Sequence, residues 1–552
     1  MALVGVLLAA LAVGLLLYMM LVAFSRPDNF PPGPPPMPIW GNYVQMLLVN
    51  YKHPYKMLDL MTRFYKSKVI GFFLGESPTI VACDYQSVKE VLNNPHLQGR
   101  PVNIALKHRM FNKELGIFFT EGPHWLEQKR FSLRNMRDFG FGRRSERLEA
   151  EIAAELRDLV ELIRGGREDQ VRLSILAVCL SSCPATQLGP SATTLVEAQS
   201  ISSWTLTFPA LLEAGVVRPS SGALSVLLPD VLLPVFVNAL LSVYTGARLP
   251  RSADATVRHL GHAAMQFQRS SDATGGFLTL HPWLAWLAPR LSGYKDNIQG
   301  SEKMRLFLEQ HIEEHKQTYS DDYMRDFIDS YLREIGERGK TGEPTMFTSE
   351  QLSLILLDFF FPTASSLPAT LTWALLFTSH HLGVQKKVQD ELDAVVGRGR
   401  LPTLDDRPNL PYTEATLREA MRIRTLTPLS VFHKATEDTT LQGYSVPRGA
   451  IVITCLYSMH MDGDLWGDPN TFRPERFLDS DGKLIKKDFT LPFGAGKRLC
   501  AGETFSKQNL FLTFSTLLQN FSIKSDGVPS ADSSVPGVIE TAPTFWAQFV
   551  PR

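Results

Sequence analysis

The sequence has no excess of either charge and little cysteine. Its 56 Lys and Arg residues balance 56 Asp and Glu residues, so it lacks the overall positive charge with which nucleic-acid-binding proteins approach their ligand. Five cysteines in 552 residues are too few, and odd in number, for a disulfide framework. No low-complexity tract or internal repeat is visible, and 44% of the residues are hydrophobic, which excludes a disordered chain. The composition indicates a large folded protein whose cysteines are reduced or include one with a chemical role.

No charged residue occurs between Ala2 and Phe24. As a helix this run would span about 34 Å, which exceeds the roughly 30 Å hydrocarbon core of a bilayer. It is longer than the apolar part of a cleaved signal peptide and is followed by no clear cleavage site. Basic residues follow the run and none precedes it, so the positive-inside rule places the body of the protein in the cytosol. We predict a membrane anchor over residues 1–25 and a stiff proline-rich linker over residues 26–42.

Beyond residue 42 the apolar pattern is mainly helical. Apolar residues at three- and four-residue spacing predict helices over residues 145–163, 302–316, 322–337, 349–381, 384–396 and 412–423. Short strands are predicted over residues 79–82, 439–446 and 450–454, with a final pair at 521–524 and 545–549. We therefore expect a mainly α protein with small β-sheets.

The most informative stretch places one cysteine in a glycine-rich loop, residues 493–502, which read Phe-Gly-Ala-Gly-Lys-Arg-Leu-Cys-Ala-Gly. Glycines such as Gly496 and Gly502 let the backbone approach a bulky group closely and adopt positive φ. A thiolate at Cys500 would gain from the helix predicted to follow it and from loop N–H groups, which we expect to lower its pKa. Arg498 suits an anionic carboxylate, and Phe493 would cover the sulfur with an apolar face. The pattern favours a thiolate that serves as a ligand.

These residues match the F-x-x-G-x-R-x-C-x-G signature at every fixed position, and the chain resembles the cytochrome P450 family, in particular the microsomal animal type of the family 2 clan. The resemblance implies haem b (iron protoporphyrin IX), with Cys500 as the iron ligand and Phe493, Gly496, Arg498 and Gly502 around it. It also implies the cytochrome P450 fold over residues 43–552. The implied activity is that of a monooxygenase, which inserts one oxygen atom from O2 into a small lipophilic substrate of steroid, hormone, fatty-acid or xenobiotic type with electrons from NADPH.

The resemblance further implies how the two haem propionates would be held. Trp125 begins a helix in the family, and Lys129 stands four positions later, where the family usually has Arg. The Lys ammonium is a point charge, whereas the Arg guanidinium of the family can bind a carboxylate with two hydrogen bonds at once. Arg100 and His433 match the other propionate contacts of the microsomal animal type. We expect these four residues and Arg498 to form one cofactor-binding constellation.

A second set of matching residues has a structural role in the family. Glu419 and Arg422 are three positions apart on a predicted helix, so their side chains share one face and can pair. Arg476 follows in the stretch Phe-Arg-Pro-Glu-Arg-Phe. The resemblance implies that Arg476 completes a network with this pair behind the haem loop, where it fixes the fold rather than taking part in chemistry.

The oxygen-activation helix departs from the family pattern of an acid followed by Thr. On the helix predicted over residues 349–381, Ser365 takes the place of the acid and Ser366 that of the Thr. Pro362 and Pro368 each remove an intrahelical N–H and are expected to kink the helix. Ser366 and Ser365 are the candidate catalytic residues, although a serine cannot carry a proton from bulk water as a carboxylate can. The departure leaves open a peroxide isomerase-type enzyme, a non-catalytic haem-binding protein, or two small residues that merely ease a kink.

Basic residues gather after Trp125 and beside the haem loop, namely Lys129, Arg130, Arg134, Arg137, Arg143, Arg144 and Lys497. The resemblance implies that this local patch docks the acidic surface of NADPH-cytochrome P450 reductase, with cytochrome b5 as a second candidate. The other implied partners are O2, the lipophilic substrate and membrane lipid. The implied location is the endoplasmic reticulum membrane, with the catalytic domain facing the cytosol.

The chain is roughly fifty residues longer than such proteins usually are. The surplus falls between two stretches that resemble neighbouring family helices, residues 151–167 and 237–260, and within a segment at about 172–230 that is poor in charged residues. We predict a poorly packed surface insertion there. Translated non-coding sequence is the alternative.

Overall fold

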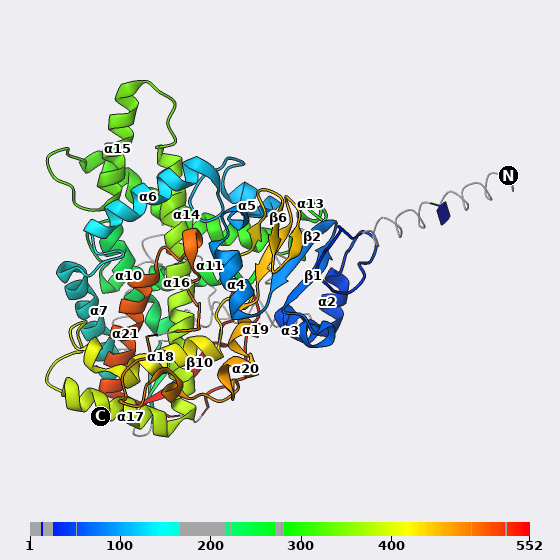
Figure 1. The fold of residues 1–552 in the computed structure, drawn as a ribbon. Coiled ribbons are helices and arrows are strands. Elements are labelled where there is room, and N and C mark those ends of the chain that lie inside the picture. Colours follow the sequence, from blue (N-terminus) through cyan, green and yellow to red (C-terminus); the bar gives the residue numbers. More distant parts are fainter. Residues whose placement is uncertain are drawn as a thin grey trace, which may run out of the picture.

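The structure is a computed structural model that describes residues 13–14, 26–50, 52–165, 216–220, 223–270, 278, 281–486, 488–524 and 527–552. Most of the expected anchor, and residues 166–215 of the chain, lie outside the described residues. The described residues form a helical body with small sheets against its sides (Figure 1). The expectation of a mainly α protein with small β-sheets is confirmed.

Helix α16 (Ser349–His380) runs through the middle of the helical body (Figure 1). The helices that pack most extensively against it are α10 (Leu233–Tyr244), α11 (Asp254–Arg269), α14 (Tyr294–Thr318), α18 (Pro411–Ile423) and α21 (Glu503–Asn520). Among the described helices α16 alone is long and apolar enough to cross a membrane, and 89% of its most apolar stretch is buried in the protein. A helix that is apolar on all sides and surrounded by others is a core helix.

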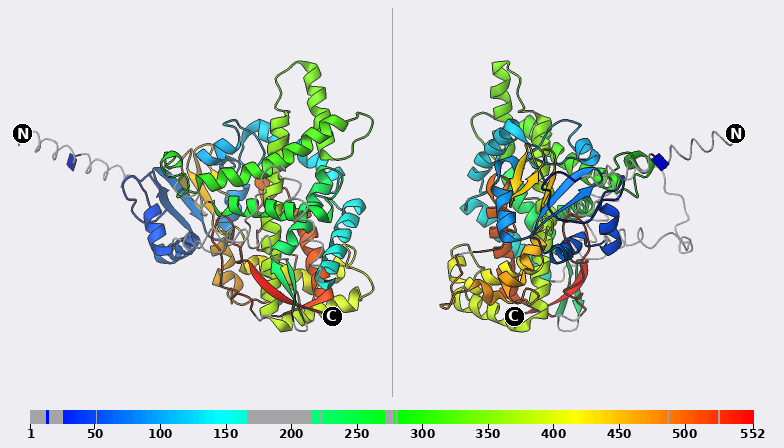
Figure 2. Two further views of the ribbon diagram at one scale, coloured as in Figure 1. Left: turned by 180° about the vertical axis from the view of Figure 1, so that it is seen from behind. Right: turned by 45° about the vertical axis from the view of Figure 1, so that its right-hand side comes forward.

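The remaining helices of four residues or more complete the body and its edges. They are α2 (Tyr43–Asn50), α3 (Pro54–Tyr65), α4 (Tyr85–Asn93), α5 (Ile104–Arg109), α6 (Gly122–Asp138), α7 (Glu146–Gly165), α13 (Leu284–Leu287), α15 (Phe327–Thr341), α17 (Leu382–Val395), α19 (Leu456–His460) and α20 (Gly463–Trp466). Helix α15 projects from one end of the body, and α2 and α3 lie beside residues 26–42 (Figures 1 and 2).

Two four-stranded sheets lie on different sides of the helical body (Figure 2). The first has the order β1-β2-β8-β5, in which only the pair β2 and β8 is parallel. The second has the order β3-β4-β10-β9 and is antiparallel throughout. A separate hairpin joins β6 to β7. The strands are β1 (Val69–Leu74), β2 (Ser77–Ala82), β3 (Val217–Ser220), β4 (Ala223–Leu228), β5 (His433–Lys434), β6 (Thr439–Leu441), β7 (Tyr444–Val446), β8 (Ile451–Thr454), β9 (Phe521–Lys524) and β10 (Phe545–Pro551).

The apolar pattern predicted most of these elements. Helices predicted over residues 145–163, 349–381, 384–396 and 412–423 end within two residues of α7, α16, α17 and α18. The predicted final pair of strands is confirmed as β9 and β10. The stretch 439–446 forms two strands instead of one, because Gln442 and Gly443 both adopt positive φ and turn the chain. Residues 237–260 likewise form parts of two helices, α10 and α11, separated by a loop that contains Gly246 and Pro250.

The last part of the expected insertion is well packed. Strand β4 pairs with the C-terminal strand β10 from Leu224 to Leu228. The side chains of Val226, Leu227 and Leu228 are buried in the main core. Val216 and Val217 are buried in the same core, and β3 pairs with β4. The expectation of a poorly packed segment is therefore wrong for the described residues between 216 and 230. For residues 172–215 it stays a prediction.

Candidate active site

The cysteine loop has a backbone that requires glycine. The Cys500 N–H donates to the Phe493 carbonyl over 2.9 Å, which closes the loop just before α21. Gly496 has a φ of 66°, and a Cβ at this position would lie 2.1 Å from the Leu92 carbonyl oxygen. No side chain fits so close to a backbone oxygen, so the loop can press against the end of α4 only with glycine here. At Gly502 a Cβ would only touch the ring of Phe141, 3.5 Å away.

Cys500 opens onto a cavity of about 860 Å³ between α16 and the cysteine loop. The cavity also receives Phe493, Arg498 and Gly502 from the loop. Burial raises the pKa of the Cys500 thiol, and a hydrogen bond with the backbone of Gly502 offsets this only in part. The backbone of Gly502 at the start of α21 thus lowers this pKa as expected, but the net pKa is raised in the protein alone because desolvation of a thiolate outweighs this contribution.

Cationic and donor groups crowd one wall of this cavity. Arg100, Lys129, His433 and Arg498 all line it. Burial lowers the pKa of Arg100 to about 9 and that of Arg498 to about 10, and the charge of Arg498 adds to the effect on Arg100. Burial and the two neighbouring guanidinium groups lower the pKa of Lys129 to about 8. Burial and Arg100 lower the pKa of His433 to about 3, so it is neutral near pH 7. The wall holds more positive charge than its own acids compensate.

Backbone carbonyls hold these side chains in place. Arg100 Nη1 donates to the carbonyls of Val431 and Phe432, while its buried Nε has no partner among the described residues. Arg498 donates to the carbonyls of Gln98 and Thr120 over 2.9 and 2.8 Å. Neutral carbonyls fix the geometry of a guanidinium group without neutralising its charge. The wall is therefore prepared for an anion.

Trp125 acts on the cavity wall through its aromatic ring, because its indole N–H is engaged elsewhere. The indole N–H donates to the Ile117 carbonyl over 2.9 Å. The Arg498 guanidinium lies 3.7 Å from the centre of the ring, and the Lys129 ammonium lies 5.3 Å from it. Lys129 also donates to the Lys497 carbonyl over 2.6 Å. The ring thus supports two cations by cation–π contact and orients them at the cavity wall.

The donor set fits a haem. A haem presents an iron that binds a cysteine sulfur and two carboxylates that need cations and N–H donors. In this cavity a cysteine sulfur faces the same space as three cationic side chains, and one buried guanidinium nitrogen lacks a partner. The cavity also has room for a lipophilic molecule and is lined in part by aromatic and aliphatic side chains such as Phe361 and Ile539.

The two serines of the oxygen-activation helix face different surroundings. Ser366 lines the cavity, and its hydroxyl makes no hydrogen bond to any described residue. Ser365 is fully buried; its hydroxyl donates to the Phe361 carbonyl over 2.6 Å and accepts from Gln268 Nε2 over 3.3 Å. Pro362 and Pro368 both lie inside α16, as the sequence indicates. The structure thus brings Ser366, and not Ser365, to the cavity.

A buried ion pair that the sequence did not signal joins α5 to α16 beside the cavity. Arg109 of α5 binds Asp358 of α16 over 2.6 Å, and both side chains are buried. The other Asp358 oxygen accepts from the backbone N–H groups of Ile117 and Phe118. The partners are 249 positions apart in the chain, and neither residue is part of a local motif. The pair anchors the loop after α5 to the helix that bears the two serines.

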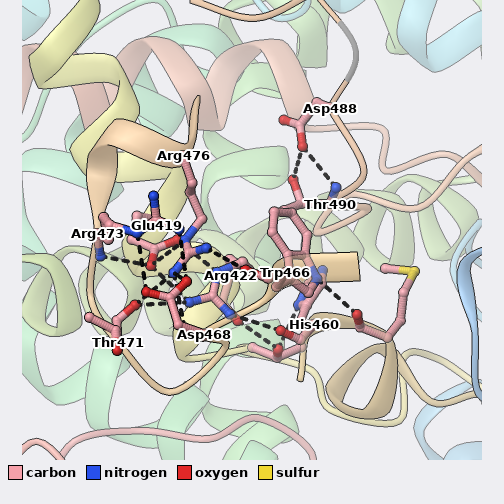
Figure 3. Close-up of polar contacts among 12 residues, drawn as sticks. Glu419, Arg422, His460, Trp466, Asp468, Thr471, Arg473, Arg476, Asp488 and Thr490 are labelled. Atoms are coloured by element: carbon pink, nitrogen blue, oxygen red, sulfur yellow. Dashed lines mark hydrogen bonds and ion pairs between the residues drawn. The ribbon is translucent and has the colours of Figure 1, made fainter. Parts of the chain in front are cut away.

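The structure brings together the three residues predicted to stabilise the fold behind the cavity (Figure 3). Glu419 accepts two hydrogen bonds from Arg422, one from the Arg476 guanidinium over 3.0 Å, and one from the Arg473 backbone N–H. Glu419 and Arg422 have no exposed surface. Every oxygen of this carboxylate is satisfied, which is what a buried ion pair requires to be tolerated.

The basic residues divide into two groups on the surface. Arg130, Arg134 and Arg137 are exposed along one face of α6, and among the described residues they form no ion pair. Arg143 instead pairs with Asp138, and Arg144 pairs with Glu149 and Asp405. The unpaired part of the predicted patch is therefore the α6 row together with the exposed Lys497.

Comparisons with known proteins agree with this geometry. A model of the cytochrome P450 family matches residues 31–183 and 262–545. The chain is 29% identical to "Probable cytochrome P450 305a1" of Drosophila melanogaster over 99% of both chains. It is 29% identical to "Farnesoate epoxidase" of Bombyx mori, over 95% of this chain and 94% of that one, and 30% identical to "Cytochrome P450 2B2" of Rattus norvegicus over 99% of both. The chain belongs to the cytochrome P450 family of monooxygenase oxidoreductases.

Proposed function

We propose that the protein is a haem-thiolate monooxygenase that inserts one oxygen atom from O2 into a small lipophilic substrate, with electrons from NADPH. The observation that carries the proposal is one cavity of about 860 Å³ that faces both the Cys500 sulfur and a wall of uncompensated positive charge. Haem b, when bound, supplies the redox chemistry of O2 activation. Residues 43–552 form the catalytic domain, in which residues 172–215 remain a predicted insertion.

The side chains of the cavity have distinct roles in this proposal. Cys500 is the metal ligand, and a thiol in this position loses its proton when a cationic metal binds it. Arg100, Arg498 and Lys129 bind the two carboxylates of the cofactor. The Nδ1 atom of His433 contacts the Leu97 carbonyl oxygen, so His433 donates to a carboxylate only when Nε2 also carries a proton. Phe493 keeps water from the sulfur. Gly496 and Gly502 let the loop approach the cofactor.

The single observation that favours a second function is the missing acid on α16. Ser365 is engaged with the Phe361 carbonyl and Gln268, so it has no path for a proton into the cavity. An enzyme that rearranges a peroxide needs no such path, and a haem-binding protein without turnover needs no oxygen activation at all. The proposed monooxygenase instead holds ordered water on the free hydroxyl of Ser366, as the family does on its Thr.

A spectrum and an activity assay test these alternatives. The reduced, CO-bound protein is expected to show an absorption band at about 450 nm, and Cys500→Ala is expected to abolish this band. NADPH-dependent oxidation of a panel of lipophilic compounds, in the presence of a reductase, then separates the monooxygenase from the other two. Turnover of an organic hydroperoxide without NADPH, together with no NADPH-dependent oxidation of the panel, would favour the isomerase.

The proposed electron donor is a membrane-bound NADPH-cytochrome P450 reductase, with cytochrome b5 as a second donor. Support comes from Arg130, Arg134, Arg137 and Lys497, which are exposed and unpaired within the described chain. Acidic partners are steered by such a local patch even when the net charge is zero.

The proposed location is the endoplasmic reticulum membrane, with the catalytic domain in the cytosol and residues 1–25 as the anchor. Helix α13 supports it, because Trp286, Leu287 and Leu291 are 73%, 74% and 92% exposed in and just after this helix. Large apolar side chains that gather on one exposed segment mark a surface that contacts protein or lipid. Figure 1 places α13 next to the sheet that contains β1 and β2, on the same side of the body as α2.

A further inference from the structure

The far part of the cavity contains two amide side chains that are held in one orientation. Gln268 stands at the end of α11 and Asn297 in the first turn of α14; both line the cavity. They are 4% and 5% exposed. Most of the neighbouring cavity residues are apolar, including Phe267, Leu278 and Phe361. Polar groups in such a place normally bind another polar group.

A serine fixes the orientation of the Asn297 amide. The Ser270 hydroxyl donates its proton to the Phe267 carbonyl over 2.7 Å, so its oxygen can only accept from other groups. Asn297 must therefore present its NH₂ to Ser270, which it does over 3.0 Å. Its carbonyl oxygen Oδ1 is the group left over, and it is buried without a partner among the described residues.

Ser365 fixes the orientation of the Gln268 amide in the same way. Ser365 donates its proton to the Phe361 carbonyl, and its oxygen accepts from Gln268 Nε2 over 3.3 Å. The backbone carbonyl of Gln268 also accepts from the Val538 N–H. The side-chain oxygen Oε1 is thus the free end of this amide as well, and it makes no hydrogen bond to the residues that the structure describes. Two carbonyl oxygens on different helices remain as acceptors for a ligand.

The backbone holds the two helix ends together at this point. Gly293, just before α14, has a φ of 75°, and a Cβ there would lie 1.8 Å from the Ser270 carbonyl oxygen. Only glycine permits this contact between the end of α11 and the start of α14. The position of Asn297 relative to Ser270 is therefore set by the backbone and does not depend on a flexible loop.

We propose that Asn297 and Gln268 form a polar subsite that accepts a hydrogen bond from a hydroxyl group of the substrate. The inference rests on the proposed function, since it names the substrate class for the same cavity: a lipophilic alcohol whose hydroxyl is bound away from the carbon that reacts. Neither acceptor oxygen contacts a cation among the described residues, which disfavours a carboxylate, because a carboxylate has no proton to donate near pH 7.

Equilibrium dialysis tests the subsite with three probes of one chain length: 1-decanol, decyl methyl ether and decanoate. The full-length, haem-loaded protein is used in lipid nanodiscs, with binding to empty nanodiscs subtracted. We expect the alcohol to bind about five- to tenfold more tightly than the ether, which is the effect of one hydrogen bond. Binding of the ether or of decanoate equal to or tighter than that of the alcohol would overturn the proposal.

Matched variants locate the effect. Asn297→Leu and Gln268→Met keep the size of the side chain and remove the acceptor; each is expected to weaken decanol binding and leave ether binding unchanged. Thr370→Val is the control, because Thr370 also lines the cavity but its hydroxyl already donates to the Ser366 carbonyl. Equal loss for alcohol and ether in Asn297→Leu would contradict the subsite.

The dialysis needs no turnover, so it can fail independently of the proposed function. A retained preference for the alcohol in a protein that oxidises nothing would support the subsite and overturn the monooxygenase. Oxidation of lipophilic compounds without any preference for the alcohol in binding would support the monooxygenase and overturn the subsite.

Discussion

At the scale of single residues, the carboxylate of Glu419 holds the buried network behind the cavity together. Glu419 has no exposed surface and receives hydrogen bonds from Arg422, Arg473 and Arg476. If Glu419 is replaced by Ala, two guanidinium groups lose their buried counter-ion. We expect the free energy of unfolding to fall by about 3–5 kcal/mol, seen as a lower urea midpoint measured by circular dichroism.

The matched control for Glu419→Ala is Asp390→Ala, which removes an exposed partner of Lys386 on α17. An exposed helical pair of this kind contributes about 0.3–0.5 kcal/mol. If the two variants shifted the urea midpoint equally, the network would not have the stabilising role that its burial indicates.

A second residue-scale prediction concerns pH. His460 is fully buried, its ring contacts the Thr425 hydroxyl, and burial together with Arg422 lowers its pKa to about 3. The unfolded chain takes up a proton at this histidine near pH 6.5, whereas the folded protein does so only near pH 3. Stability from this residue is therefore complete above about pH 6.5 and is lost as the pH falls, by up to about 1.4 kcal/mol per pH unit.

Replacing His460 by Asn keeps a hydrogen-bonding atom near Thr425 and removes the titration. The free energy of unfolding, measured in urea between pH 7 and pH 4, is expected to fall less steeply in His460→Asn than in the native protein. The difference in slope corresponds to the uptake of up to one proton fewer per molecule on unfolding. An unchanged slope would show that this histidine does not titrate on unfolding.

Local patterns identified the residues of the cysteine loop, and the family resemblance added distant residues such as Arg100 and His433, but neither identified pairs that belong to no motif. Cys500, Arg498 and Phe493 stand within eight positions of one another, so a fixed pattern contains them. Arg109 and Asp358, or Gln268 and Ser365, are brought together by the packing of α5, α11 and α16. Nothing in the local sequence marks a buried Arg or an oriented Gln, because the same residues are most often found at the surface.

At the scale of elements, helix α16 combines two prolines with hydroxyls that bond back to its own carbonyls. Ser365 donates to the Phe361 carbonyl, Thr370 to that of Ser366, and Thr372 to that of Pro368. Such bonds satisfy or compete for main-chain carbonyls one turn earlier and bend helices. These three hydroxyls add to the bend expected from Pro362 and Pro368, whereas the Ser366 hydroxyl is free at the cavity.

The two serines of α16 are expected to respond differently to replacement by Ala. Ser366→Ala removes a free hydroxyl at the cavity, so it should raise the share of NADPH electrons released as hydrogen peroxide severalfold and leave the urea midpoint unchanged. Ser365→Ala leaves Gln268 Nε2 without an acceptor and should lower the free energy of unfolding by about 1–3 kcal/mol with unchanged coupling. Unchanged coupling in Ser366→Ala would remove this serine from the proposed mechanism.

Helix α6 supplies the second element-scale prediction. Reversal of charge at Arg134 and Arg137 is expected to slow reduction by the reductase about tenfold or more at low salt and to flatten its dependence on ionic strength, because long-range attraction is screened by salt. Stopped-flow reduction under CO measures both. Lys56→Glu on α3 is the control, since Lys56 is exposed and unpaired within the described chain but lies on a distant helix. Equal effects of both reversals would exclude a docking role for α6.

At the scale of the whole molecule, periodic patterns predicted the helices and their approximate ends, whereas of the strand pairings only the final one, β9 with β10, was predicted. Helix α16 was recognisable because its apolar residues extend over its full length. The parallel pairing of β2 with β8 joins Thr79 to Ile451, and β4 pairs with β10 from the other end of the chain. Pairing depends on the tertiary fold, and a short strand carries little information about its partner.

The exposed apolar segment around α13 gives the prediction that concerns the molecule in its membrane. If this surface enters lipid, Trp283 and Trp286, which are 49% and 73% exposed, lie within reach of acyl chains. Vesicles of brominated lipid should then quench part of the tryptophan fluorescence of the full-length protein, and Trp283→Phe with Trp286→Phe should remove most of the quenched part. Trp373→Phe, at a buried position in α16, should leave it unchanged. Equal quenching in the double variant and the native protein would mean that another face meets the bilayer, and the catalytic domain would then be oriented by residues 1–25 alone.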